Sequence, residues 1–159
     1  MNKEEYGDKF TDHLIEEYKL YVQMADNVSN RRAQANAFFI SVLSALLVFL
    51  SLTGERKPLG DVQNAAYIAI TILGFLLCYV WLVNIQSYRQ LNSGKFKVIH
   101  EIEQQLPFPP YAKEWDILGR EKDARKYLQL TRVERYVPIL LAIPFLLIFA
   151  YTIYKLFVG

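Results

Sequence analysis

Three long runs of apolar residues constrain the fold of this chain more than any other feature. They cover residues 35–52, 62–85 and 137–158, and Lys155 is the one charged residue within them. A helix needs roughly 20 apolar residues to cross about 30 Å of hydrocarbon, whereas a buried helix of a soluble core needs roughly 10 to 14. The sequence therefore predicts an all-α, polytopic integral membrane protein with three transmembrane helices.

The positions of Lys and Arg predict the orientation in the membrane. Five of them lie in residues 1–34, two in residues 53–61, ten in residues 86–136 and one in residues 137–158. Cytoplasmic segments of membrane proteins carry an excess of these residues. We therefore expect residues 1–34 and 86–136 to be cytoplasmic, residues 53–61 to form a short outer loop, and the C-terminus to be periplasmic or extracellular.

The first predicted cytoplasmic segment is an amphipathic helix that continues into the membrane. Phe10, Leu14, Tyr18 and Tyr21 follow one another at spacings of four, four and three, which is close to a heptad repeat. Neither proline nor glycine separates this pattern from the apolar run that follows. The sequence predicts a single helix from about residue 10 to residue 52.

The second apolar run also continues past the membrane as a helix. Leu91, Ile99, Ile102 and Leu106 lie near one face, and Gly94 marks a kink or a close crossing. Pro107 ends this helix, and the following PFPPY sequence is typical of an extended connector. A turn is expected at Gly119, and a further helix from about residue 121 leads into the third span.

These helical extensions predict self-association. One chain offers little to cover their apolar faces, and copies of the same chain are the simplest partners. We expect a homo-oligomeric ring with long cytoplasmic helical extensions. The candidates for its interface are Phe10, Leu14, Tyr18, Tyr21, Leu91, Ile99, Ile102 and Leu106.

The remaining partners follow from charge. Arg31 and Arg32 are expected at the level of the lipid headgroups, either as topological anchors or as a site for anionic lipid. The net charge of +2 is too small to indicate a nucleic-acid-binding protein. An unidentified cytoplasmic protein is a further candidate partner.

No catalytic, cofactor-binding or metal-binding set is visible in the sequence. HEIEQ begins like a zinc-protease helix at His100 but has Gln104 where the second histidine is required. Cys78 lies in an apolar run, where a thiol behaves as a small hydrophobic group. We expect a non-enzymatic protein without cofactors, in which His100 is a solvated or interface residue; pH sensing is the alternative for it.

Three stretches of the sequence resemble a known family. RRAQANAFFISVLSALL, WLVNIQSYRQLNSGKFKVIHEIEQQLPFPPYAKEW and LTRVERYVP are similar to the RipA-like family of small bacterial membrane proteins, which are described as octameric. The resemblance implies an all-helical bacterial inner-membrane oligomer of eight subunits, in a family linked to adaptation and growth in the host. It brings no enzymatic activity, cofactor or catalytic residue.

The expected function is accordingly that of a structural, scaffolding or sensing assembly that acts through its cytoplasmic helical layer. The alternative is a channel or a pore-forming membrane effector. Ser41, Ser44 and Thr71 are the residues expected to line such a pore. A distant likeness to two-pass helical effectors of bacterial conflict systems favours this alternative, and the third span argues against it.

Overall fold

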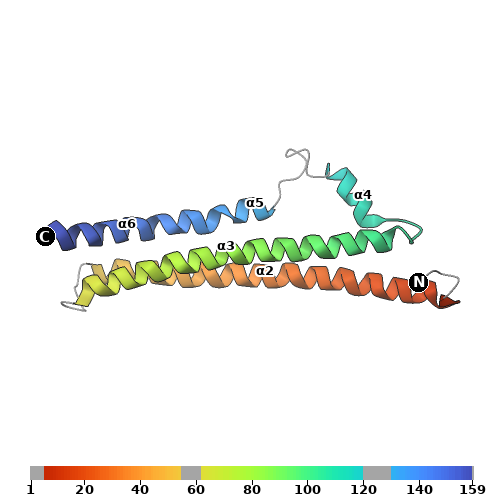
Figure 1. Cartoon of the computed structure of the whole chain (residues 1–159), viewed down its shortest axis with the longest axis horizontal. Helices are drawn as coiled ribbons and strands as arrows, with labels where there is room; N and C mark the ends of the chain where they lie inside the picture. The colour runs from red at the N-terminus through yellow and green to blue at the C-terminus, as the bar shows by residue number, and fades with distance from the viewer. Residues whose placement is uncertain (1–5, 55–61, 120–129, 159) are drawn as a thin grey trace. The chain divides into compact units, whose positions relative to one another are not determined.

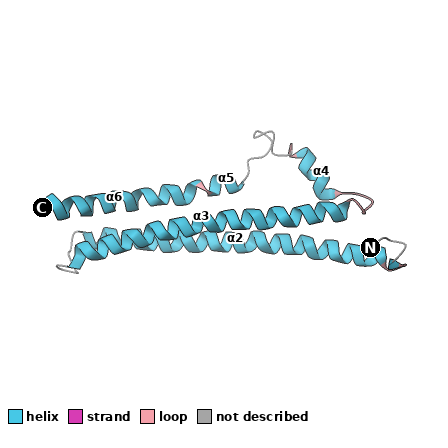
Figure 2. Cartoon of the chain, in the orientation of Figure 1, coloured by secondary structure: helices cyan, strands magenta, loops and turns pink. Residues whose placement is uncertain are grey.

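The computed structural model of the chain describes residues 6–54, 62–119 and 130–158. These residues form helices and no strand, as the sequence predicts (Figure 2). In chain order the helices are α2 (Phe10–Gly54), α3 (Gln63–Glu103), α4 (Pro110–Ile117), α5 (Leu130–Glu134) and α6 (Tyr136–Val158) (Figure 1).

The chain folds into two compact units, and α2 and α3 each contribute to both. Unit 1 comprises residues 1–32 and 87–129, and unit 2 comprises residues 33–86 and 130–159. Three stretches, Phe10–Gly54, Gln63–Glu103 and Leu130–Val158, are long and apolar enough to cross a membrane. The prediction of three helices that are able to cross a membrane is thereby confirmed, and the third stretch includes α5 as well as α6.

The apolar core of unit 2 lies between α2, α3 and α6. Leu43, Trp81 and Phe145 are among its largest buried side chains. The indole of Trp81 stacks on Phe39 and donates a hydrogen bond of 2.8 Å to the Asn36 side-chain oxygen. The indole N–H of α3 thus finds its acceptor on α2, although both groups lie in an apolar core.

A second polar contact holds α2 and α3 together where α2 ends. The hydroxyl of Tyr67 lies 2.9 Å from the Thr53 hydroxyl and donates to the carbonyl of Leu50 at 3.2 Å. The Gln63 amide donates to the Thr53 carbonyl at 3.1 Å. The last four carbonyls of a helix have no partner within the helix, so the Gln63 amide satisfies one of them, the Thr53 carbonyl, at the end of α2.

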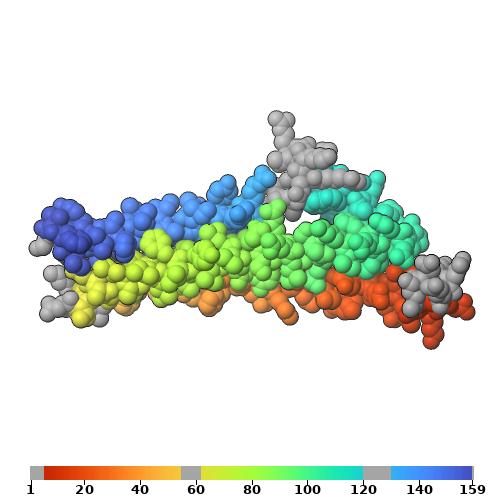
Figure 3. Space-filling view, viewed as in Figure 1, coloured from red at the N-terminus to blue at the C-terminus, as the bar shows by residue number. Residues whose placement is uncertain are grey.

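The core of unit 1 is formed by one face of α2 and one face of α3. Leu14, Ala25 and Val28 of α2 are buried, as are Ile99 and Ile102 of α3. The Lys95 ammonium lies 5.8 Å from the ring centre of Tyr21, a cation–π contact between the two helices. In the space-filling view the side chains of α2 and α3 meet along the unit (Figure 3).

The expectations for the segment after α3 are confirmed in one part and wrong in another. Gly119 has a φ of 78°, which confirms the turn expected there. Pro110 does not continue an extended connector but begins α4, a helix that the sequence pattern did not predict. The helix expected from about residue 121 lies outside the described residues as far as residue 129.

The third apolar helix is interrupted near its beginning. α5 ends at Glu134 and α6 begins at Tyr136. Pro138 has no N–H group, so it cannot donate the helical hydrogen bond to the carbonyl of Glu134, four residues earlier. This missing bond explains why α5 and α6 are two helices rather than one.

Candidate functional site

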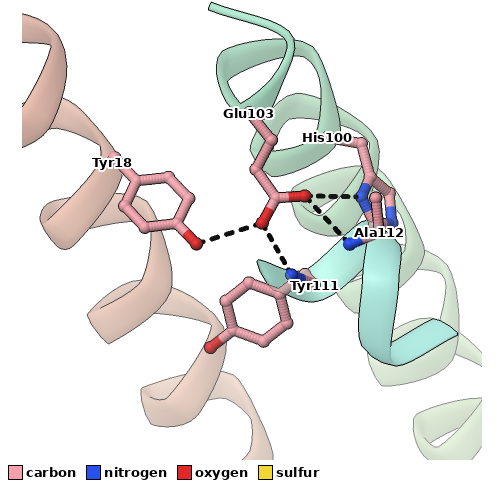
Figure 4. A network of polar contacts seen from close by, with 5 residues as sticks. All are labelled: Tyr18, His100, Glu103, Tyr111 and Ala112. Carbon is pink, nitrogen blue, oxygen red and sulfur yellow. Dashed lines mark hydrogen bonds and ion pairs between the residues drawn. The ribbon is translucent and has the colours of Figure 1, made fainter. Parts of the chain in front are cut away.

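A buried carboxylate at the end of α3 is the centre of the most connected polar cluster in the described part of the chain. The Glu103 side chain is 1% exposed. Figure 4 shows its two oxygens between residues from three helices: Tyr18 of α2, His100 of α3, and Tyr111 and Ala112 of α4. A buried charge is tolerated only when hydrogen bonds replace the lost water, so both oxygens of this carboxylate need donors from the protein.

Four donors surround the Glu103 carboxylate. Oε1 accepts the backbone N–H of Tyr111 at 2.7 Å and the hydroxyl of Tyr18 at 3.1 Å. Oε2 accepts the backbone N–H of Ala112 at 3.0 Å, and His100 Nδ1 lies 3.3 Å from it. A carboxylate can accept hydrogen bonds at about four lone-pair positions, so these four partners occupy them all.

The two backbone donors explain why a glutamate occurs at this position. Pro110 is the first residue of α4, and Tyr111 and Ala112 are the second and third. Their N–H groups have no acceptor within the helix, and the N-cap residue Pro109 supplies no side-chain hydrogen bond. Glu103 therefore caps α4 from outside that helix, and its negative charge also suits the positive end of the helix dipole.

Hydrogen bonding sets the charge state of Glu103. Burial alone would raise the pKa of its carboxyl, but the hydrogen bonds from Tyr111, Ala112, His100 and Tyr18 outweigh burial and lower this pKa below its ordinary value. Glu103 is anionic at neutral pH as a result. Burial and the adjacent carboxylate raise the pKa of Tyr18, so its phenol stays protonated and remains a donor.

Aromatic contacts complete the attachment of α4 to α3. The rings of Phe96 and Tyr111 meet edge to face with centroids 5.5 Å apart. Phe96 also lies against His100, with centroids 6.4 Å apart. The cluster thus combines a charged helix cap with apolar contact, and its geometry serves to fix α4 on unit 1.

The predicted interface residues occupy different environments in a single chain. Leu14, Ile99 and Ile102 are buried within unit 1, so in this structure they hold α2 and α3 of one copy together. Phe10, Tyr18, Tyr21 and Leu106 are half-buried, and Leu91 is exposed. We expected one chain to leave the apolar faces of its helical extensions uncovered, and this expectation is wrong for Leu14, Ile99 and Ile102. An interface between copies stays a prediction.

Two further groups of predicted residues can be placed. Arg31 is exposed and Arg32 is half-buried at the end of unit 1. Ser41 and Ser44 are exposed in unit 2, but Thr71 is completely buried and donates to the carbonyls of Tyr67 and Ile68. The expectation that Thr71 lines a pore is therefore not compatible with this structure.

Neither α4 nor the role of Glu103 was predicted from the sequence, although a signal for Glu103 exists. Glu103 is four residues after Ile99 and therefore lies on the same face of the helix. Glu101, two residues earlier, is exposed, so the two carboxylates do point to different sides. An acid on an apolar face of a helix indicates a buried polar partner, but the sequence does not indicate that α4 supplies it.

The two histidines of the chain lie in separate contacts. His13 Nδ1 lies 2.8 Å from the Tyr6 hydroxyl, whereas His100 belongs to the Glu103 cluster. Among the residues that the structure describes, no group of three or more His, Cys, Asp or Glu side chains is placed to hold a metal ion.

Comparison with known proteins agrees with the resemblance seen in the sequence. No curated protein and no solved structure matches the chain. The model of the octameric membrane protein family (8xMP) matches residues 15–154, a range that includes the first two apolar runs, most of the third and the Glu103 cluster. Since this match covers most of the chain, the protein belongs to the octameric membrane protein family.

Proposed function

We propose that this chain forms a homo-octamer in the bacterial inner membrane, and that unit 1 forms a cytoplasmic helical layer that acts as a scaffold or a sensor. Family membership supports self-association in groups of eight. The scaffold or sensor role rests on the helical layer itself.

The length of α2 and α3 is the observation that carries this proposal. At 1.5 Å per residue, their 45 and 41 residues give lengths of about 68 and 62 Å, roughly twice the hydrocarbon thickness of a bilayer. About half of each helix must therefore lie outside the hydrocarbon. The long apolar runs are in the half that belongs to unit 2, and the half that belongs to unit 1 bears the charges.

We also propose that the protein is not an enzyme, and the engagement of the Glu103 carboxylate supports this proposal. A catalytic acid or base needs a free position near its substrate, whereas the oxygens of Glu103 are engaged by four donors that belong to the fold. The carboxylate thus acts on α4 and holds it against α2 and α3.

Native mass spectrometry of the detergent-purified protein tests the assembly. Eight copies of 18.5 kDa should give about 148 kDa of polypeptide. A monomer as the only folded species would contradict the proposal.

Labelling with a membrane-impermeant maleimide tests the orientation. In a Cys78→Ala background, Glu16→Cys should be protected in intact spheroplasts and become reactive after permeabilisation. Glu55→Cys, in the predicted outer loop, should react before permeabilisation. The reverse pattern would place unit 1 outside the cell and contradict the cytoplasmic assignment.

A pore between copies is the second candidate function. Ser41 and Ser44 support it because both are exposed on α2 in the apolar part of the chain. The Ser41 hydroxyl donates to the Ala37 carbonyl at 2.8 Å, so its own helix already satisfies its donor. Single-channel recording in planar bilayers tests this function, and a reproducible conductance abolished by Ser44→Leu would favour the pore over the scaffold.

A further inference from the structure

The basic residues nearest to the three apolar runs, on the side predicted to be cytoplasmic, are all arginines. Arg31 and Arg32 directly precede the uncharged residues 33–54 of α2, and Arg89 directly follows the uncharged residues 62–88. Arg135 is the last residue before α6. The lysine nearest to any of these runs on that side is Lys95, six residues beyond Arg89.

Acidic residues are scarce at these positions. α2 has no acidic residue after Asp26, and α3 has none before Glu101. Asp26 is five residues before Arg31, which places it about 140° around the helix axis, on another side of α2. Glu134 lies next to Arg135, but Arg132 of α5 is a second arginine there. Each of the three helical stretches therefore has a net positive charge where its apolar run begins or ends.

Four of these arginines are available to a ligand. Arg31, Arg89, Arg132 and Arg135 are exposed, and within the described part of the chain their side chains form no ion pair or hydrogen bond. Arg32 is half-buried and has an interaction within the protein, so it is not counted with them. We call the four exposed residues the boundary arginines.

Tyrosines beside the boundary arginines indicate their depth in the membrane. Tyr88 directly precedes Arg89, and Tyr136, which is 60% exposed, directly follows Arg135. Tyrosine side chains are enriched where lipid headgroups meet the hydrocarbon, because one end of the side chain is apolar and the other polar. The guanidinium groups are thus expected at the level of the lipid phosphates.

We propose that the boundary arginines bind the phosphate groups of anionic phospholipids. A guanidinium group donates two parallel hydrogen bonds to two phosphate oxygens, whereas a lysine ammonium acts as a point charge. An orientation signal requires only positive charge, which lysine and arginine both supply. The use of arginine at the end of all three runs therefore favours phosphate binding over anchoring alone.

The same charges select among lipids. A zwitterionic lipid carries a cation beside its phosphate, and arginines without neighbouring acids repel that cation. An anionic headgroup has no such cation, so its attraction to basic residues is stronger. This inference requires only that the apolar runs lie in a bilayer, so it goes beyond the proposed octamer and does not depend on it.

Native mass spectrometry of the full chain tests the lipid preference. The protein is purified in micelles that contain equal amounts of phosphatidylglycerol and phosphatidylcholine, and the bound lipids are counted. The parent chain should retain more phosphatidylglycerol than phosphatidylcholine. The triple variant Arg31→Gln, Arg89→Gln and Arg135→Gln should lower this ratio by about five-fold for each arginine until the preference is lost.

A second triple variant separates phosphate binding from positive charge. Arg31→Lys, Arg89→Lys and Arg135→Lys keeps the charge and should keep the orientation in maleimide labelling, but its lipid ratio should lie between those of the parent chain and the glutamine variant. If the glutamine variant is less stable than the parent chain in lipid-free detergent, the lysine variant still decides the result. Glycerol 1-phosphate has no acyl chains to lie beside the apolar runs, so at the same concentration it should not displace the lipid.

The matched control removes three positive charges elsewhere. Lys19, Lys97 and Lys113 are exposed and at least eight residues from any boundary arginine. Their combined replacement by glutamine should leave the lipid ratio unchanged. Equal retention of both lipids by the parent chain, an equal loss in the control, or a lysine variant with the ratio of the parent chain would overturn the inference. Displacement by glycerol 1-phosphate would overturn a lipid as the ligand. None of these outcomes would change the number of subunits, which the same spectra report.

Discussion

The ring of Phe145 on α6 lies against Gly74 on α3, so a Cβ atom at position 74 would stand 2.6 Å from two of the ring carbons. Phe145 is completely buried, and it follows Pro144, which removes one helical hydrogen bond of α6. Glycine at position 74 therefore permits a close approach of α6 to α3 in unit 2.

Gly74→Ala should accordingly weaken the attachment of α6. The added methyl group forces the ring of Phe145 to move within a packed core, which costs about 1–3 kcal/mol. Thermal unfolding in detergent micelles should show a lower midpoint. Gly94→Ala is the matched control, since nothing lies within 4 Å of a Cβ at that position. It should keep or raise the midpoint, because alanine favours a helix over glycine by about 1 kcal/mol. Equal effects of both substitutions would contradict the role of the Phe145 contact.

The long helices could be predicted from the sequence, whereas α4 could not. Residues 10–52 carry a continuous helical pattern without proline or glycine, and α2 follows it from Phe10 to Gly54. The eight residues of α4 are too few to show a reliable period, and the prolines before them suggested an extended chain. The contact that caps α4 is a tertiary one with Glu103, and local sequence patterns do not contain it.

The same reasoning explains the outcome for the interface residues. An apolar stripe such as the one that includes Ile99 shows that a surface will be buried but not by what. In the structure, Ile99 and Ile102 are buried where α3 packs against α2 of the same chain, whereas Leu91 is exposed. An Ile99→Asp substitution would therefore disrupt unit 1 itself rather than separate intact copies.

Glu103→Gln should release α4. A neutral amide has only one oxygen to accept the N–H groups of Tyr111 and Ala112, and it places an NH2 group where Oε1 or Oε2 accepts now. Loss of a charged acceptor from a buried cap costs about 1–3 kcal/mol. Hydrogen–deuterium exchange should increase in residues 110–117. Glu101→Gln, an exposed neighbour on the same helix, should leave exchange there unchanged; an increase of equal size would show that the capping contact is not responsible.

Tyr18→Phe should have a smaller effect on the same region. It removes one donor of Glu103, the hydroxyl at 3.1 Å, but keeps the ring and both backbone hydrogen bonds. The expected cost is about 1 kcal/mol. Exchange in residues 110–117 should lie between that of the parent chain and that of Glu103→Gln. An effect larger than that of Glu103→Gln would indicate a separate role for Tyr18.

The attachment of α4 should depend on pH with a defined sign. Because the folded structure lowers the pKa of Glu103, its contribution to stability is present above the ordinary carboxyl pKa and is lost as pH falls through the lowered value. Protection of residues 110–117 from exchange, corrected for the intrinsic pH dependence of exchange, should be constant near neutral pH and decline in the acid range. Glu103→Gln should lack this decline. A decline of the same size in that variant would assign the effect to other groups.

Asn36→Leu should destabilise unit 2 although it makes the helix more apolar. The Trp81 indole N–H donates to Asn36 at 2.8 Å, and Trp81 is 2% exposed, so the substitution leaves this donor without its acceptor inside the core. Polar contacts between membrane helices are worth about 0.6–2 kcal/mol. The combination with Trp81→Phe, which removes the donor as well, should cost less than the sum of the single changes. Unfolding in mild detergent measures the four species of this double-mutant cycle, and additive costs would show that the hydrogen bond does not contribute.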